Sequence, residues 1–218
     1  MSAPHAVVTG ASRGIGAALA RELRARGWQV TATSRDEGGD RLALDVTDPA
    51  SFGALARVLD ARPVDLLVCN AGIYPDKGQS LHDGFPPEMW AETFATNVTG
   101  VFLTVQALLP NLRAAERPRI AVISSQMGSS TRAAGGSYIY RASKAAAINL
   151  GRNLAADLAG EGIAVGIYHP GWVRTGMGGA GATLSPGDSA KGLADRVEAL
   201  DIATSGRFET WDGREHPF

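Results

Sequence analysis

The sequence predicts an α/β protein, a single doubly wound domain of about seven parallel strands with helices on both faces. Two observations carry this prediction: strand-like and helix-like segments alternate along the whole chain, and a glycine-rich loop joins the first strand to the first helix. With 218 residues, of which 44% are hydrophobic, one domain spanning 1–218 is the natural expectation.

The strands are predicted from short apolar or β-branched runs bounded by turn residues. Parallel strands need crossover connections, and right-handed crossovers place the ligand crevice at the carboxyl ends of the strands. The expected strands are 5–9, 28–33, 41–44, 64–69, 120–124, 163–168 and 207–211.

The helices are predicted from helical periodicity between these strands. Pro49, Pro87 and Pro186 stand at early helical positions, with Asp48 and Ser185 as N-caps for two of them. A segment rich in Gly and Ala, 175–187, lacks periodicity, so we expect a mobile loop there. The expected helices are 15–26, 49–61, 87–112, 138–159 and 186–200.

Composition excludes several functional classes. The net charge of -1 gives no electrostatic basis for binding nucleic acid or an anionic membrane. Cys69 is the only cysteine, which rules out an internal disulfide and fits a reducing compartment. The sequence shows neither a long apolar span nor a leader at Met1. We therefore expect a cytoplasmic protein, with no membrane association and no metal in its site.

The loop after the first strand has the context of a dinucleotide site. Its glycines, Gly10, Gly14 and Gly16, let a backbone approach a pyrophosphate, and the helix N-terminus that follows offers unpaired N–H groups. The spacing Gly-x-x-x-Gly-x-Gly differs from the commoner Gly-x-Gly-x-x-Gly, and a plain glycine turn is the alternative.

A tyrosine and a lysine lie one helical turn apart in the fourth predicted helix. Tyr140 and Lys144 share a helix face at i and i+4, where a cation can stabilise a phenolate and lower the tyrosine pKa from its usual value near 10. Tyrosine then becomes useful for moving protons. The same spacing also occurs on ordinary amphipathic helices.

Six motifs in order make the chain resemble the short-chain dehydrogenase/reductase family, with Rossmann-type folding, from end to end. They comprise the glycine loop, Asn70-Ala71-Gly72, Asn97, Ser125, the Tyr140/Lys144 pair, and His169-Pro170-Gly171-Trp172-Val173-Arg174-Thr175. Ser125 precedes Tyr140 by a slightly longer segment than is usual, which resembles the carbonyl-reductase branch that includes C-factor-like proteins. Ser124 is a weaker rival for the serine role.

The resemblance implies an oxidoreductase that binds NADP(H). It also implies which residues are catalytic and which bind the cofactor. Asn97, Ser125, Tyr140 and Lys144 are the expected catalytic residues, with Asn97 holding a water that links Lys144 to solvent. The expected cofactor-binding residues are Gly10, Ser12, Arg13, Gly14, Ile15, Gly16, Ser34, Arg35, Asp45, Val46, Asn70, Ala71, Gly72, Tyr140, Lys144, Pro170, Val173 and Thr175.

The choice of NADP over NAD follows from charge. An NAD enzyme places an acid just after the second strand, whereas this chain has Ser34 and Arg35 there and Arg13 in the glycine loop. Guanidinium groups suit a dianionic 2′-phosphate, although solvated arginines are the alternative. Asp36 lies one residue too late in the sequence to contact the ribose 2′-hydroxyl, and we interpret it as a solvated turn residue. Asp45 resembles an adenine contact, or it caps the next segment.

We expect the protein to reduce an apolar ketone or aldehyde, with hydride from NADPH and a proton from Tyr140. The residues that follow the motifs have few charged residues near them. These residues could line a substrate pocket, or they could be ordinary packing residues. An NAD-dependent alcohol dehydrogenase and a catalytically silent dinucleotide sensor are the alternatives, and Ala- and Leu-rich helices hint at a homodimer or homotetramer. The pocket candidates are Tyr74, Gln126, Met127, Tyr138, Trp172 and Met177, with His82 and Trp90 further away.

Overall fold

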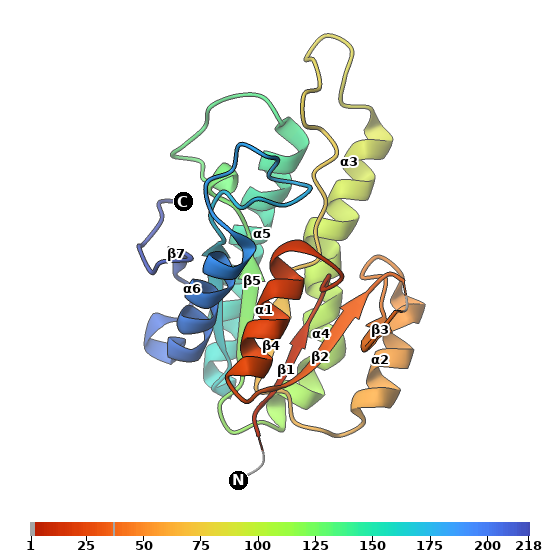
Figure 1. Ribbon diagram of the computed structural model, residues 1–218, viewed down its shortest axis with the longest axis vertical. Coiled ribbons are helices and arrows are strands. Elements are labelled where there is room, and N and C mark those ends of the chain that lie inside the picture. Colours follow the sequence, from red (N-terminus) through yellow and green to blue (C-terminus); the bar gives the residue numbers. More distant parts are fainter. Residues whose placement is uncertain (1–2, 37) are drawn as a thin grey trace.

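A seven-stranded parallel sheet with the order β3-β2-β1-β4-β5-β6-β7 forms the centre of the protein (Figure 1). The structure is a computed structural model that describes residues 3–36 and 38–218. The chain builds outward from β1 in one direction and then in the other, so β1 and β4 flank the switch point of a doubly wound fold. The strands are β1 (His5–Val8), β2 (Gln29–Ser34), β3 (Arg41–Ala43), β4 (Leu66–Cys69), β5 (Arg119–Ile123), β6 (Ala164–His169) and β7 (Phe208–Thr210).

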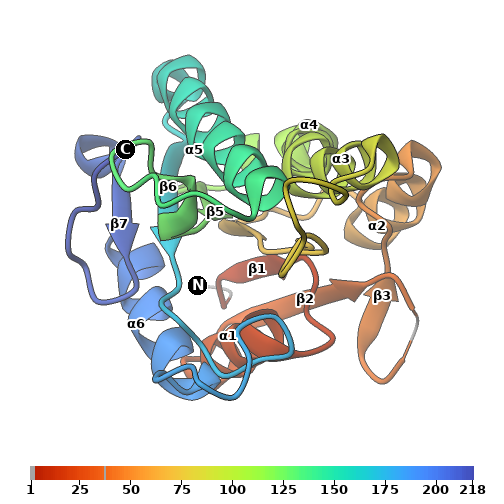
Figure 2. The same ribbon diagram turned by 90° about the horizontal axis from the view of Figure 1, so that it is seen from above.

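Helices cover both faces of this sheet, as the view from above shows (Figure 2). The predicted seven-stranded architecture is confirmed, and each predicted strand and helix has a counterpart in the structure. The α-helices are α1 (Gly14–Ala25), α2 (Phe52–Leu59), α3 (Pro87–Phe94), α4 (Gly100–Arg113), α5 (Tyr138–Leu158) and α6 (Pro186–Ala199). Short helical turns are η1 (Pro49–Ser51), η2 (Ala95–Thr99), η3 (Gln126–Gly128), η4 (Ala159–Glu161) and η5 (Ile202–Thr204).

Two hydrophobic cores form because successive residues of each strand point to opposite faces. On β1, Val7 packs in the core with α2, α4 and α5, whereas its neighbours Ala6 and Val8 pack in the core with α1 and α6. The strands are therefore buried on both faces, which explains their nearly continuous apolar sequences. Cys69 belongs to the first of these cores and is a packing residue.

The predicted caps at Asp48 and Ser185 are confirmed. The Asp48 carboxylate accepts from the N–H of Ala50, and the Ser185 hydroxyl accepts from the N–H of Asp188. Each cap satisfies a helix-terminal N–H that has no intrahelical partner. Within the part of the chain that the structure describes, no helix is both long enough and apolar enough to span a membrane.

Two segments differ from the sequence expectation. The predicted helix 87–112 is not continuous, because the π-helical turn η2 at Ala95–Thr99 separates α3 from α4. The 175–187 segment is also less irregular than expected: Val173 and Leu184 form a parallel bridge at its base, and the Arg174 guanidinium donates to the carbonyl of Thr183 at 2.8 Å. Both differences arise from contacts that local sequence patterns do not encode.

Candidate active site

The glycine loop lies against the Asn70-Ala71 turn at the carboxyl ends of β1 and β4. The Asn70 side-chain amide donates to the carbonyls of Thr9 and Gly10 at 2.9 and 3.0 Å. A Cβ on Gly10 would lie 2.7 Å from Cα of Ala71, and a Cβ on Gly16 would lie 2.5 Å from the Gly10 carbonyl oxygen. These contacts leave no room for side chains, so glycine is required where the two motifs meet.

The start of α1 fits an anionic group. Gly14 has a φ of +60°, Arg13 provides no side-chain cap, and the first turn contains no acidic residue. The N–H groups at this end are thus left for a ligand, and the helix dipole favours a negative charge there. Thr175 reaches the same loop, because a Cβ on Gly14 would lie 3.3 Å from its methyl group. The residues present therefore fit a pyrophosphate.

The proposed catalytic pair is buried at the start of α5. Tyr140 is 6% exposed and Lys144 is 5% exposed, and the Lys144 ammonium lies 5.8 Å from the centroid of the Tyr140 ring. Burial raises the pKa of Tyr140 to about 12, against a lowering influence of Ser125. Burial also lowers the pKa of Lys144 to about 8. The expected lowering of the Tyr140 pKa by Lys144 is wrong for this structure, because desolvation dominates.

Lys144 is held at the meeting point of two other motifs. Its ammonium donates to the carbonyl of Ile123 at 3.0 Å, at the end of β5. A Cβ on Gly72 would lie 3.5 Å from this nitrogen and 3.2 Å from Oδ1 of Asn97. Lys144 and Asn97 therefore both approach the turn after β4 closely at Gly72.

Asn97 lies in the π-helical turn and is fully buried. Its side-chain oxygen accepts from the N–H of Ile73 at 2.8 Å, while its amide donates to the Ile73 carbonyl and to the Ser143 hydroxyl. The side chain thus ties η2 to the turn after β4 and to α5. Because both N–H groups of its side-chain amide are already donated within the protein, Asn97 can hold the predicted water only through an oxygen atom.

The two candidate serines have different surroundings. The Ser124 hydroxyl donates to the Lys144 carbonyl at 3.0 Å and serves as a structural link to α5. The Ser125 hydroxyl accepts from the N–H of Met127 and is close enough to Tyr140 to influence its pKa. Gly128 completes this contact, since a Cβ there would lie 2.6 Å from the backbone of Lys144. This arrangement supports Ser125 over Ser124.

Arg35 directly follows β2, Arg13 stands in the glycine loop, and Arg41 lies on the neighbouring strand β3. Arg13 and Arg35 are exposed, and among residues 3–36 and 38–218 neither side chain forms a hydrogen bond or an ion pair. Arg41, on β3, was not predicted as a site residue, and its guanidinium donates to the Ser34 hydroxyl at 3.1 Å. Its strand register places it beside β2, which is a relation that only the sheet pairing reveals.

The remaining predicted cofactor residues occupy the same edge of the sheet. Asp45 accepts from the N–H and the hydroxyl of Thr47, which together lower its pKa, and its predicted adenine contact stays a prediction. Val46 packs on Gly100, and the Pro170 carbonyl accepts from Ser189. Ser12 is exposed on the glycine loop, whereas Ile15 and Val173 pack toward the protein interior.

The predicted pocket residues are only partly brought together. Tyr74 stacks on Tyr140 with ring centroids 4.2 Å apart, and the Tyr140 hydroxyl lies 3.9 Å from the Met177 sulfur. Trp172 is exposed and donates to the Gly178 carbonyl. Gln126 and Met127 form part of η3 beside α5, and Tyr138 packs on Phe85. The His82 backbone N–H donates to the Ser80 hydroxyl, and Trp90 stacks on Phe94 within α3.

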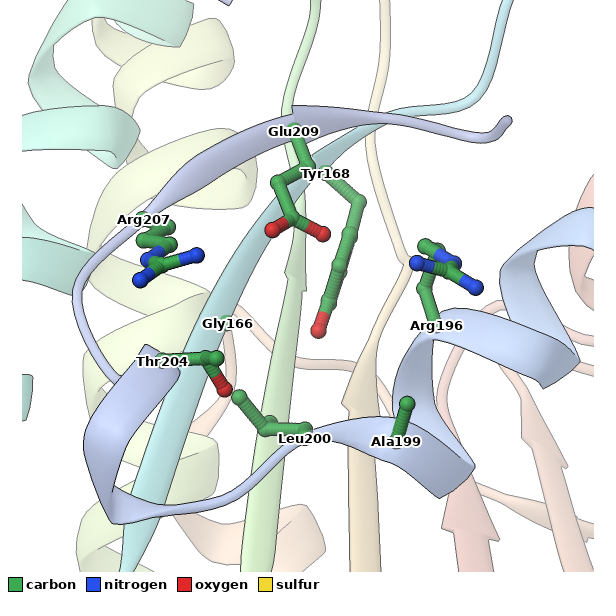
Figure 3. A pocket seen from close by; sticks show the side chains of 8 residues that line it. All are labelled: Gly166, Tyr168, Arg196, Ala199, Leu200, Thr204, Arg207 and Glu209. Carbon is green, nitrogen blue, oxygen red and sulfur yellow. The ribbon is translucent and has the colours of Figure 1, made fainter. Parts of the chain in front are cut away.

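A small hollow of about 50 Å³ lies elsewhere, between β6, β7 and the end of α6. Figure 3 shows Arg196 and Arg207 on opposite sides of this hollow, with Glu209 and the Tyr168 hydroxyl between them. None of the motif residues lines it. We therefore place the candidate active site at the motifs and not at this hollow.

Comparisons with known proteins agree with this geometry. The family model described as short chain dehydrogenase matches residues 4–183. The chain is 40% identical over 157 residues to the C-signal of Myxococcus xanthus, covering 72% of this chain and 93% of the relative. It is 37% identical over 186 residues to a 3-oxoacyl-[acyl-carrier-protein] reductase of Escherichia coli, covering 79% of this chain and 74% of the relative.

Solved structures with similar folds include carbonyl reductases. The NADPH-bound carbonyl reductase from chicken fatty liver superimposes with a TM-score of 0.90 at 29% identity, and each chain is covered completely. The carbonyl reductase Sniffer of D. melanogaster gives a TM-score of 0.91 at 25% identity, again with complete coverage of both chains.

Proposed function

Because the chain belongs to the short chain dehydrogenase family, we propose that it is an NADPH-dependent reductase that converts a ketone or aldehyde to an alcohol. The observation that carries the proposal is the position of Tyr140. This buried phenol lies beside Ser125 and Lys144, at the same sheet edge as a glycine loop that fits a pyrophosphate. Retention of all these groups favours an enzyme over a silent dinucleotide sensor.

The preference for NADPH is supported by the charges after β2. Arg41 donates to the Ser34 hydroxyl, Arg35 follows Ser34 in the chain, and Arg13 stands in the glycine loop. No acidic residue stands at the position where an NAD enzyme holds the ribose hydroxyls. Guanidinium groups bind phosphate through paired, charge-assisted hydrogen bonds. The chicken carbonyl reductase binds NADPH, and a similar protein from Burkholderia multivorans was solved with NADP.

When bound, the cofactor supplies the hydride, and the protein controls the carbonyl oxygen that gains charge. The Tyr140 hydroxyl donates its proton to that oxygen, and the Ser125 hydroxyl holds the same oxygen by a second hydrogen bond. A tyrosine whose pKa is near 12 retains its proton at neutral pH, which suits the role of acid in reduction. Lys144 binds the nicotinamide ribose, and Asn97 holds the water that returns protons.

The substrate class is an apolar carbonyl compound. Tyr74 stacks on the Tyr140 ring, the Met177 sulfur lies beside the Tyr140 hydroxyl, and the exposed Trp172 donates to the carbonyl of Gly178, next to Met177. The identity to a 3-oxoacyl-[acyl-carrier-protein] reductase favours a 3-oxoacyl thioester as a second candidate. The two substrate candidates differ because a 3-oxoacyl thioester brings a long polar carrier group that the site must accommodate, whereas an apolar ketone or aldehyde does not.

A panel of carbonyl compounds tests the proposal. The purified protein is mixed with NADPH or NADH and an aliphatic ketone, an aromatic aldehyde or acetoacetyl-CoA, and loss of nicotinamide absorbance is followed. We expect turnover of the apolar ketone or aldehyde with NADPH and much slower turnover with NADH. Activity restricted to acetoacetyl-CoA would support the second candidate, and inactivity with every pair would reject the proposed function.

A further inference from the structure

The start of the catalytic helix α5 is capped by a residue from a distant loop. Asp76, which follows β4, is fully buried, and its carboxylate accepts from the N–H of Ile139 at 2.9 Å and from the N–H of Tyr140 at 3.3 Å. The local N-cap residue, Ser137, has a φ of +47° and provides no side-chain cap. The helix-terminal N–H groups of α5 therefore depend on Asp76 for an acceptor.

Tyr74, from the same loop, contacts the same helix start from another side. Its ring stacks on the Tyr140 ring with an interplanar angle of 23°, and its hydroxyl lies 2.6 Å from the Ser137 hydroxyl. A buried carboxylate without a bound partner is costly, so the two N–H contacts fix where Asp76 and α5 lie relative to each other. The loop and the helix start thus form one rigid unit.

We propose that Asp76 is a positioning residue that holds the Tyr140 hydroxyl at its working distance from Ser125 by capping α5 from outside the helix. This inference rests on the proposed function for its effect on turnover. The capping contact itself exists in the chain without any ligand. A positioning error of about 1 Å is enough to lower an enzymatic rate by about a hundredfold.

The charge of Asp76 also acts on the proton donor. The carboxylate raises the pKa of Tyr140, in the same direction as burial and Tyr74, which favours the protonated phenol. On the same helix, the neighbouring titratable side chains are Arg141, whose guanidinium donates to the Met127 carbonyl, and Lys144, whereas η3 and Met177 contribute no titratable side chain near the hydroxyl. Lys77, the neighbouring charge on the Asp76 loop, is exposed and lies beside Gly179.

Two variants separate the geometric effect from the charge effect. Asp76→Asn keeps an oxygen acceptor for the Ile139 N–H but removes the charge, whereas Asp76→Ala removes both. Asp201→Asn is the matched control, because Asp201 caps the exposed turn η5 through the N–H of Thr204. Amide hydrogen exchange of the ligand-free proteins measures how well the capped N–H groups are protected, and it does not depend on enzymatic activity.

We expect faster exchange of the Ile139 and Tyr140 amides in Asp76→Ala, a smaller increase in Asp76→Asn, and no change there in Asp201→Asn. If Asp76→Ala does not fold, the comparison between Asp76→Asn and Asp201→Asn still decides. Wild-type exchange at both amides in Asp76→Asn and Asp76→Ala would overturn the capping role. This measurement stands even if the carbonyl panel shows no turnover.

Turnover tests the positioning role. We expect kcat to fall by about three- to tenfold in Asp76→Asn and by about ten- to a hundredfold in Asp76→Ala, with little change in KM for NADPH. In Asp76→Asn the basic limb of the kcat profile should move to lower pH, because the phenol loses its proton more easily once the carboxylate charge is gone. An unchanged kcat and an unmoved limb would restrict Asp76 to stabilising the fold.

Discussion

At the scale of single residues, burial decides the acid–base properties of Tyr140 and Lys144. Both side chains are almost completely inaccessible, and desolvation opposes the charged form of each, which raises one pKa and lowers the other. The pair spacing could be predicted from the sequence, but the direction of the tyrosine shift could not. The direction of this pKa shift depends on the loop after β4 and on η3, two segments distant in sequence that bury the phenol.

Lys144 should make the stability of the ligand-free protein depend on pH. Its folded-state pKa of about 8 lies below its ordinary value of 10.5, so the unfolded chain binds more protons between these values. The cost of burying the ammonium is therefore fully present below pH 8 and disappears as the pH rises toward 10.5.

Lys144→Met removes this cost while keeping a similar shape. We expect the variant to be more stable than the wild type by about 1–3 kcal/mol at pH 7, with the difference shrinking between pH 8 and 10.5. Urea denaturation at several pH values measures it. A difference that stays constant with pH would show that Lys144 is not desolvated as described.

Arg35 should discriminate between the two nicotinamide cofactors. A charge-assisted hydrogen bond to phosphate contributes about 1.5–3 kcal/mol, so Arg35→Asp should weaken NADPH binding by about tenfold to a hundredfold and improve NADH binding. Fluorescence titration with each cofactor measures this change. Arg21→Asp, an equal charge change on the exposed side of α1, is the control. Equal weakening in both variants would mean that only the overall charge matters.

At the scale of elements, the sequence identifies nearly every strand and helix because the strands are doubly buried and the helices carry apolar stripes. The features it misses are made by contacts between distant segments. The π turn at Asn97 follows from its bonds to Ile73 and Ser143, and Arg41 reaches Ser34 only through strand pairing. The cap from Asp76 to α5 likewise has no local sequence signal.

Close packing between η3 and α5 fixes the distance between Ser125 and Tyr140. Gly128→Ala would place a Cβ 2.6 Å from the Lys144 backbone, so we expect a loss of about 1–3 kcal/mol in unfolding free energy and a large loss of activity. Gly160→Ala is the control, because a Cβ there meets no atom within 4 Å. Thermal and denaturant unfolding measure both, and a fully stable Gly128→Ala protein would contradict this packing.

We predict that the 175–187 segment, expected from the sequence to be a mobile loop, closes as a lid over the substrate. Met177 touches the Tyr140 hydroxyl and the base is closed by the Val173–Leu184 bridge, so the loop contacts the site where the substrate carbonyl should lie. We expect cleavage between Gly176 and Gly187 to slow when NADPH and a substrate analogue are both bound. Limited proteolysis measures this. Cleavage at the same rate with and without ligands would leave the segment as a simple connection.

At the scale of the whole molecule, the doubly wound sheet brings motifs from six places in the chain to one edge. Strand order and register are what unite the glycine loop, Asn70, Ser125 and the Pro170 loop, and this convergence could be predicted because parallel strands end at the same edge. Assembly into a homodimer or homotetramer and a cytoplasmic location stay predictions; light scattering measures the first.

The transfer of deuterium from labelled NADPH to a carbonyl compound tests the central claim most directly. With NADPH deuterated at its hydride-donating carbon, the wild type should give an alcohol that carries one deuterium on the former carbonyl carbon. Tyr140→Phe should bind NADPH equally well but form this product about 10²- to 10⁴-fold more slowly, because the proton donor is missing. Formation of the labelled alcohol by Tyr140→Phe at the wild-type rate, or no labelled alcohol from the wild type, would contradict the account.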